Sequence, residues 1–67
     1  MNAEKILITL IQTITQNLEE LASLKRKNSF VYGEKTAYVE CLEILQMWQG
    51  APSQNLNYNV QQKYLNY

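Results

Sequence analysis

Residues 7–21, LITLIQTITQNLEEL, place branched aliphatic side chains at alternating intervals of four and three residues. This spacing is typical of an amphipathic helix, because residues three and four apart share one face, and it also matches the seam of a coiled coil. A chain of 67 residues cannot easily cover so wide a stripe by itself, so we expect partner chains or further helices against it. The stripe consists of Leu7, Ile11, Ile14, Leu18 and Leu21.

The helix built on this stripe is predicted to run from about residue 3 to residue 27. Asn2 precedes it as a candidate N-cap, and three consecutive cations stand near its end, where they interact favourably with unpaired carbonyl groups. Ile6 lies at the edge of the apolar face and Ile8 well outside it, so the first two turns imply a second contact. The expected apolar face also includes Ala3, Leu10 and Leu24.

A break is predicted at residues 27–29, where Asn28 suits the end of one helix and Ser29 the start of the next. The second helix then spans about residues 30–49 and is stopped by the Gly-Ala-Pro sequence at 50–52. Because the connection is short, the two helices are expected to be antiparallel neighbours. The expected apolar face of the second helix consists of Phe30, Ala37, Tyr38, Cys41, Ile44, Leu45 and Trp48.

Glu34 conflicts with this pattern, because it projects near the centre of the expected apolar face and a buried carboxylate is costly. One explanation is that the regular helix starts near Gly33, which leaves Glu34 in a first turn where a carboxylate is favoured. The alternative is an ion pair with a cation of residues 25–27, across the hairpin or across a dimer, that fixes the register.

The composition changes after Pro52, since residues 53–67 carry one charge, Lys63, and are rich in Asn, Gln and Tyr. Alternating apolar residues at 56, 58 and 60 fit a strand, whereas Val60, Tyr64 and Tyr67 would line one side of a short helix. We favour a short helix or turn packed on the hairpin, with Ile6 and Ile8 as its receiving surface. Disorder is the alternative for so polar a segment.

The residues needed for catalysis or metal binding are nearly absent. The chain has no histidine and a single cysteine, so it has neither an intrachain disulfide nor a usual zinc set. Cys41 is expected to be a small buried hydrophobic side chain rather than a nucleophile. Glu40 and Glu43 are interpreted as a solvated surface, and the two glycines form no phosphate loop. We therefore expect no enzyme activity, no cofactor and no metal.

Six Lys and Arg balance six Glu, so the chain has no net charge with which to attract nucleic acid or an anionic membrane. The N-terminus fits neither a secretory signal nor a membrane span, and a cytoplasmic location is the expectation. The one basic cluster is a possible nucleic-acid contact together with nearby aromatic side chains, although three charges at a helix end are commonplace. Its residues are Lys25, Arg26 and Lys27, with Tyr32 beside them.

Residues 32–46, YGEKTAYVECLEILQ, resemble the second helix of short, uncharacterised bacterial and phage-related proteins built as helical hairpins. The resemblance covers about a fifth of the chain. It implies a small cytoplasmic or mobile-element-encoded helical protein, with no activity and no functional residue attached.

The sequence thus predicts an all-α chain: a helical hairpin at 1–52 that dimerises into a four-helix bundle, followed by the polar tail at 53–67. A monomeric three-helix bundle is the competing arrangement. The expected function is a non-enzymatic interaction or regulatory protein that works as a dimer and binds a protein partner; a small nucleic-acid-associated regulator is the alternative. The expected core or dimer interface consists of Leu7, Leu10, Ile11, Ile14, Leu18, Leu21, Tyr38, Cys41, Leu45 and Trp48.

Overall fold

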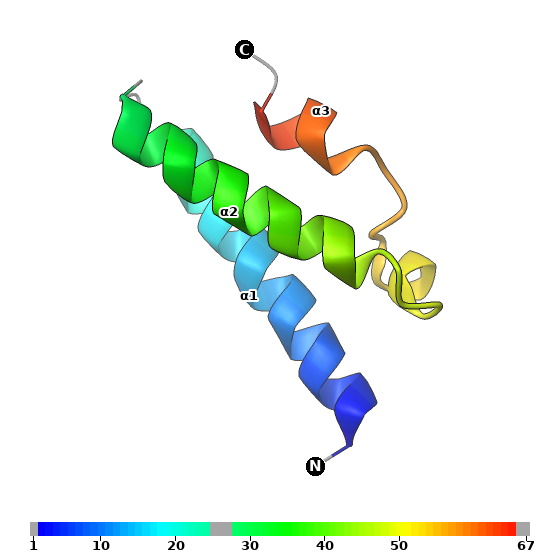
Figure 1. Cartoon of the computed structure of the whole chain (residues 1–67). Helices are drawn as coiled ribbons and strands as arrows, with labels where there is room; N and C mark the ends of the chain where they lie inside the picture. Colours follow the sequence, from blue (N-terminus) through cyan, green and yellow to red (C-terminus); the bar gives the residue numbers. More distant parts are fainter. Residues whose placement is uncertain (1, 25–27, 66–67) are drawn as a thin grey trace.

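The computed structural model describes residues 2–24 and 28–65, and all the regular structure in these two ranges is helical. Two long helices, α1 (Ala3–Ser23) and α2 (Ser29–Leu45), pack against each other as a hairpin. They are followed by a 3₁₀ turn, η1 (Ala51–Gln54), and by a short helix, α3 (Val60–Leu65), that packs against α2 (Figure 1). The predicted all-α class with two long packed helices is confirmed.

Helix α1 begins as expected but ends early. The Asn2 side chain caps its first turn by accepting a hydrogen bond from the Lys5 backbone N–H at 2.8 Å. The helix ends at Ser23 rather than near residue 27, because Leu24 has extended backbone angles, φ −74° and ψ 126°. The Ser23 hydroxyl donates to the Glu20 carbonyl at 2.7 Å, a local bond that competes with continuation of the helix. Residues 25–27 lie outside the described ranges.

Asn28 starts α2 instead of ending α1. Its backbone is extended, with φ −128°, and its side chain accepts a hydrogen bond from the Val31 N–H at 2.8 Å, so Asn28 and not Ser29 is the N-cap. Glu34 accordingly lies in the second turn and is half-buried. The helix ends at Leu45, four residues before the predicted end, and gives way to turns in which the Trp48 N–H bonds the Leu45 carbonyl.

The side of α2 that is buried differs from the apolar face that the sequence pattern predicts, and the two sides lie next to each other around the helix. Phe30, Ala37, Cys41 and Ile44 belong to the face that the sequence pattern predicts to be apolar, and all four are exposed in the single chain. The reason is that α2 carries two apolar stripes about 100° apart, and the second of them meets both α1 and the tail. The buried residues of α2 are Val31, Val39, Leu42 and Leu45.

The described part of the polar tail, residues 53–65, packs on the hairpin and supplies three residues to the core. Leu56, Val60 and Tyr64 are at most 8% exposed, so the preferred alternative, a short helix packed on the hairpin, is the one observed. Ile6 does not receive the tail, since 44% of its surface is exposed. The main cluster of buried side chains consists of Ile11, Ile14, Leu18, Val39, Leu42, Leu45, Ala51, Leu56, Val60 and Tyr64.

Two turns after α2 bring the tail back onto the hairpin. A side chain at Gly50 would overlap the indole ring of Trp48, so the ring can fold over the backbone only because this residue is glycine. Asn55 adopts a left-handed conformation, φ 64°, which asparagine tolerates better than most residues, and so ends η1. The Gln46 side chain then donates to the Tyr58 carbonyl at 2.7 Å and holds the returning segment.

Candidate interaction surface

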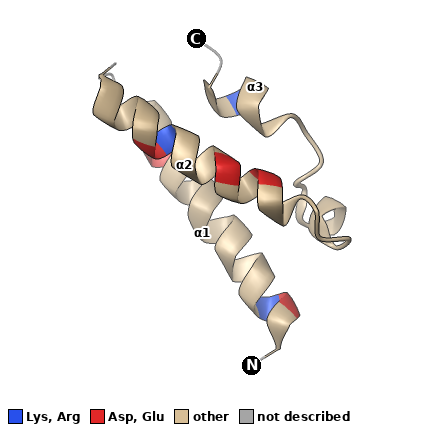
Figure 2. Ribbon diagram, in the orientation of Figure 1, with Lys and Arg blue, Asp and Glu red and all other residues tan. Residues whose placement is uncertain are grey.

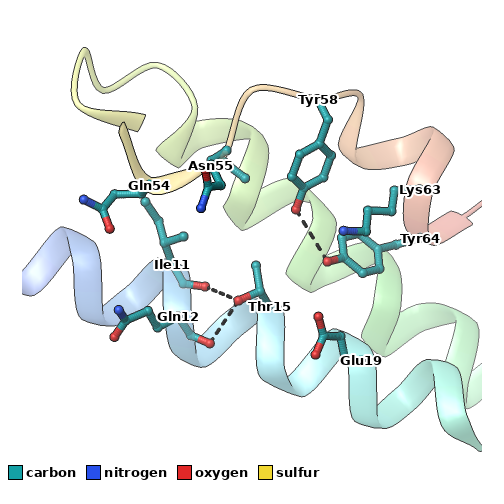
Figure 3. A pocket seen from close by; sticks show the side chains of 10 residues that line it. Ile11, Gln12, Thr15, Glu19, Gln54, Asn55, Tyr58, Lys63 and Tyr64 are labelled. Atoms are coloured by element: carbon teal, nitrogen blue, oxygen red, sulfur yellow. Dashed lines mark hydrogen bonds between the residues drawn. The ribbon is translucent and has the colours of Figure 1, made fainter. Parts of the chain in front are cut away.

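The tail covers one side of the layer formed by α1 and α2. On α1, Thr15 faces Tyr58 and Tyr64 across a groove (Figure 3). On α2, Gln46 bonds the Tyr58 carbonyl, and the Glu43 carboxylate oxygens accept from Gln61 Nε2 at 3.5 Å. Thr15 therefore marks the side of α1 that faces the tail. Gln46 marks the side of α2 that faces the tail.

The opposite side of α1 is apolar and exposed. At 100° per residue, Ile6, Leu10 and Leu24 lie about 140–180° around the helix from Thr15. Their exposed fractions are 44%, 43% and 49%. No described residue of α1 before Ile11 is buried, and in Figure 1 the N-terminal end of this helix stands apart from the rest of the molecule.

The matching side of α2 is even more exposed. Phe30 and Ile44 are 73% and 67% exposed, and Ala37 and Cys41 lie exposed between them. All four lie about 140–180° around α2 from Gln46, so they also point away from the tail. The exposed apolar residues of both helices thus share one side of the hairpin. This surface is called the open face, and it consists of Ile6, Leu10, Leu24, Phe30, Ala37, Cys41 and Ile44.

The α1 half of the open face carries little charge, whereas half-buried Glu34 lies within about 60° of the exposed stripe of α2. No charged residue occurs in α1 between Lys5 and Glu19. Figure 2 shows the charged residues of α1 near its two ends, with a long uncharged stretch between them. Asn17, half-buried about 160° around α1 from Thr15 and so on the same side as Leu10, makes no side-chain hydrogen bond to the described residues. Because burying a large aliphatic or aromatic side chain is worth roughly 1.5–3 kcal/mol, leaving Phe30 and Ile44 in water forgoes several kcal/mol.

The residues expected in a core or interface divide into three groups. Four are buried within the single chain, four are half-buried, and two are exposed. Cys41 is one of the exposed pair, so the expectation that its thiol is buried is wrong for the single chain; it lies on the stripe of α2 that faces away from α1 and the tail. The buried residues are Ile11, Ile14, Leu18 and Leu45; the half-buried ones are Leu7, Leu21, Tyr38 and Trp48; Leu10 and Cys41 are exposed.

The possible partner or nucleic-acid contacts are only partly described. Lys25, Arg26 and Lys27 lie outside the described ranges, so the proposed pairing of Glu34 with them stays a prediction. Tyr32 is 47% exposed and Met47 is 85% exposed. Neither residue belongs to the open face, because both lie on the side of α2 that faces the tail or next to it.

The groove beneath the tail is polar and holds a cluster of aromatic and charged side chains (Figure 3). Its volume is about 290 Å³. Lys63 Nζ lies 4.6 Å from the centre of the Tyr58 ring and 5.4 Å from that of Tyr64, within the range of cation–π attraction. The two tyrosine hydroxyls are 3.5 Å apart.

The hydroxyl group of Tyr58 has a pKa that is shifted from its ordinary value. Burial of its hydroxyl and the hydrogen bond with Tyr64 raise the pKa of Tyr58 to about 12, because both disfavour the phenolate, while the charge of Lys63 acts in the opposite direction. A hydroxyl with so high a pKa stays neutral near pH 7. The cluster therefore offers no ready general base near neutral pH.

Sequence analysis missed the residues that dock the tail, above all Gln46 and Tyr58. Gln46 projects beside Leu42 and Leu45 on the buried side of α2, and a polar residue in that position is a signal that backbone groups from elsewhere must meet it. The sequence gives a weaker indication of the Tyr58–Lys63–Tyr64 cluster, because the positions of these residues bring them together only if residues 60–65 form a short helix.

Comparisons with known proteins give no relative to set beside this geometry. The chain matches no protein-family model, no curated protein and no solved structure. The resemblance of residues 32–46 to phage-related hairpin proteins therefore stays a prediction. In the part of the chain that the structure describes, no helix is long and apolar enough to cross a membrane.

Proposed function

We propose that this chain is a non-enzymatic interaction protein that works as a homodimer, in which the open faces of two copies pack together as a four-helix bundle. The observation that supports this most directly is the open face itself: Phe30 and Ile44 are 73% and 67% exposed on the same side as the exposed leucines of α1. Exposed apolar patches of this kind mark interaction sites in soluble proteins.

A second copy is the occupant that fits this surface best. Two antiparallel helices side by side form a flat layer, and two such layers stacked face to face are a four-helix bundle. A surface that pairs with itself suits the two-fold symmetry of most homodimers. Small chains that lack a disulfide or a metal commonly gain stability in this way.

The size of the open face is adequate for a dimer. Helix α2 has 17 residues, so at 1.5 Å per residue the layer is about 25 Å long, and two helices side by side are about 20 Å wide. One copy therefore offers about 500 Å², and two copies bury about 1,000 Å², the lower end of what specific interfaces need. The tail side and the ends of the helices stay available for a protein partner.

Light scattering coupled to size exclusion tests the proposal on the full chain. We expect a dimer at micromolar concentration, and Ile44→Ser should raise its dissociation constant at least about tenfold, the equivalent of 1.4 kcal/mol. Glu43→Ser is the matched control, because this neighbouring residue is exposed on the tail side of the same helix. Circular dichroism checks that each variant stays helical. A wild-type monomer over this concentration range would contradict the proposal and favour a monomeric three-helix adaptor.

A further inference from the structure

The groove beneath the tail has a buried floor and a polar rim. Ile11, Leu56 and Tyr64 line it and are at most 8% exposed. The Thr15 hydroxyl is held in place because it donates to the Ile11 and Gln12 carbonyls at 2.8 and 3.0 Å, and its oxygen can still accept a hydrogen bond. The volume of 290 Å³ equals that of about ten water molecules and is close to the lower limit for small-molecule sites. The groove therefore suits one small molecule.

Two opposite charges line one end of this groove without pairing. Glu19 comes from α1 and Lys63 from α3 (Figure 3). Both charges reach the Tyr58 hydroxyl, since Glu19 raises the pKa of Tyr58 and Lys63 lowers it. No ion pair within 4.0 Å joins the two, and neither forms one with another described residue. Each charge is therefore available to a ligand group of opposite sign.

The other end of the groove carries three primary amides. Figure 3 shows Gln54 and Asn55 on the tail and Gln12 on α1 at this end. Their side chains make no hydrogen bond to the described residues. Each amide has both donors and an acceptor, so together they match a neutral polar group better than a third charge.

A ligand with a single charge does not satisfy this arrangement. An anion attracted by Lys63 would be repelled by Glu19, and a cation would meet the reverse. A molecule that carries both charges a short distance apart can pair with both residues at once. The charges of the groove therefore select for a zwitterion.

We propose that the groove binds a free α-amino acid with a neutral polar side chain. Its carboxylate pairs with Lys63 Nζ, its ammonium pairs with the Glu19 carboxylate, and its side chain reaches the amides at the other end. This site is independent of the proposed dimer, because it lies within one copy and on the side of the hairpin opposite the open face.

A titration of the isotope-labelled full chain followed by NMR tests the proposal, with L-glutamine as the probe. At about pH 6 the α-ammonium group, whose pKa is about 8, is protonated and a glutamate side chain is ionised. We expect saturable shifts of the backbone amide signals of Gln54, Asn55 and Tyr58. The dissociation constant should be about a millimolar, because both ion pairs are exposed to solvent.

Two relatives of the probe separate its charges. N-acetyl-L-glutamine lacks the ammonium and L-glutaminamide lacks the carboxylate, so each should bind at least about threefold more weakly than L-glutamine. Equal binding of the three compounds would overturn the pairing of charges. Failure of L-glutamine to saturate the shifts in the millimolar range would overturn the site itself.

Exchanging the charges of the groove should reverse its preference. Glu19→Gln is expected to weaken L-glutamine about threefold and to strengthen N-acetyl-L-glutamine, because the repulsion of the anion is removed. Lys63→Gln should likewise weaken L-glutamine and strengthen L-glutaminamide. Glu20→Gln is the matched control, since this neighbouring residue is exposed and does not line the groove.

A purely structural role of Glu19 and Lys63 would not produce these opposite changes in preference. Binding of all three compounds as in the wild type, by both variants, would overturn the roles assigned to the two charges. A wild-type monomer that still binds L-glutamine would overturn the proposed dimer and leave the site standing.

Discussion

The two sides of the α1–α2 layer differ in what covers their apolar residues. On the tail side, Leu56, Val60 and Tyr64 cover the hairpin and are themselves at most 8% exposed. On the open face, Phe30 and Ile44 are 73% and 67% exposed. The difference shows that a few apolar residues in an otherwise polar segment can complete a core, and that they complete one side only. The other side stays exposed in the single chain.

The largest expected effect compares two leucines of α1. Leu18 is fully buried toward the tail side, and Leu10 is 43% exposed on the open face. We expect Leu18→Ala to lower the free energy of unfolding by about 2–5 kcal/mol, because it leaves a cavity. Leu10→Ala should cost less than about 1 kcal/mol in dilute protein. Chemical denaturation at low, equal protein concentration measures both. Equal losses would remove the distinction between the two sides.

Gly50→Ala is expected to have the next largest effect. The new methyl group would overlap the Trp48 ring, which must leave its position over the backbone. Overpacking of this kind costs about 1–3 kcal/mol. The free energy of unfolding and the fluorescence of the chain's single tryptophan report the change. Gly33→Ala is the control, since a methyl group there meets nothing and should not lower the stability of the monomer.

Gln46→Leu should weaken the attachment of the tail. The substitution removes the hydrogen bond to the Tyr58 carbonyl at 2.7 Å and leaves that carbonyl half-buried without this partner. We expect a loss of about 1 kcal/mol in the free energy of unfolding and faster amide hydrogen exchange in α3 than in α2. Uniform exchange across the three helices would show that the tail does not depend on this contact.

The smallest expected effect is a loss of stability at high pH. The pKa of Tyr58 is raised from 10.0 to about 12, so the folded chain holds the proton more tightly than the unfolded chain. The resulting stabilisation is fully present below about pH 10 and is lost as the pH rises toward 12. Denaturant melts between pH 9 and 12 should show a smaller decline for Tyr58→Phe than for the wild type. An identical decline would show that Tyr58 does not contribute to it.

Much of the hairpin could be predicted from local rules. The spacing of Ile11, Ile14 and Leu18 identifies the buried face of α1, and Asn2 has the capping role expected of it. These features depend on residues within one or two turns of each other. The end of α2 was placed too late because the apolar pattern continues through Trp48, whereas the chain turns at Leu45.

The tail and the orientation of α2 needed more than local rules. Each of the two stripes of α2 is a reasonable core by periodicity, and periodicity cannot say which of them meets α1. The choice depends on where Leu56 and Val60 return in space, and their return depends on the turns at Gly50 and Asn55. A contact between residues ten or twelve positions apart, such as those of Gln46 with the tail, leaves no periodic trace in the sequence.

By itself, the sequence determined that this chain is helical, where its two long helices lie, and that they carry more apolar surface than one hairpin can cover. The tertiary structure decided which stripe of α2 is buried, that the tail seals one side, and that Phe30, Ala37, Cys41 and Ile44 face outward. The physical reason is that helix formation and amphipathicity are set by neighbours along the chain, whereas burial is set by whatever segment arrives from elsewhere to exclude water.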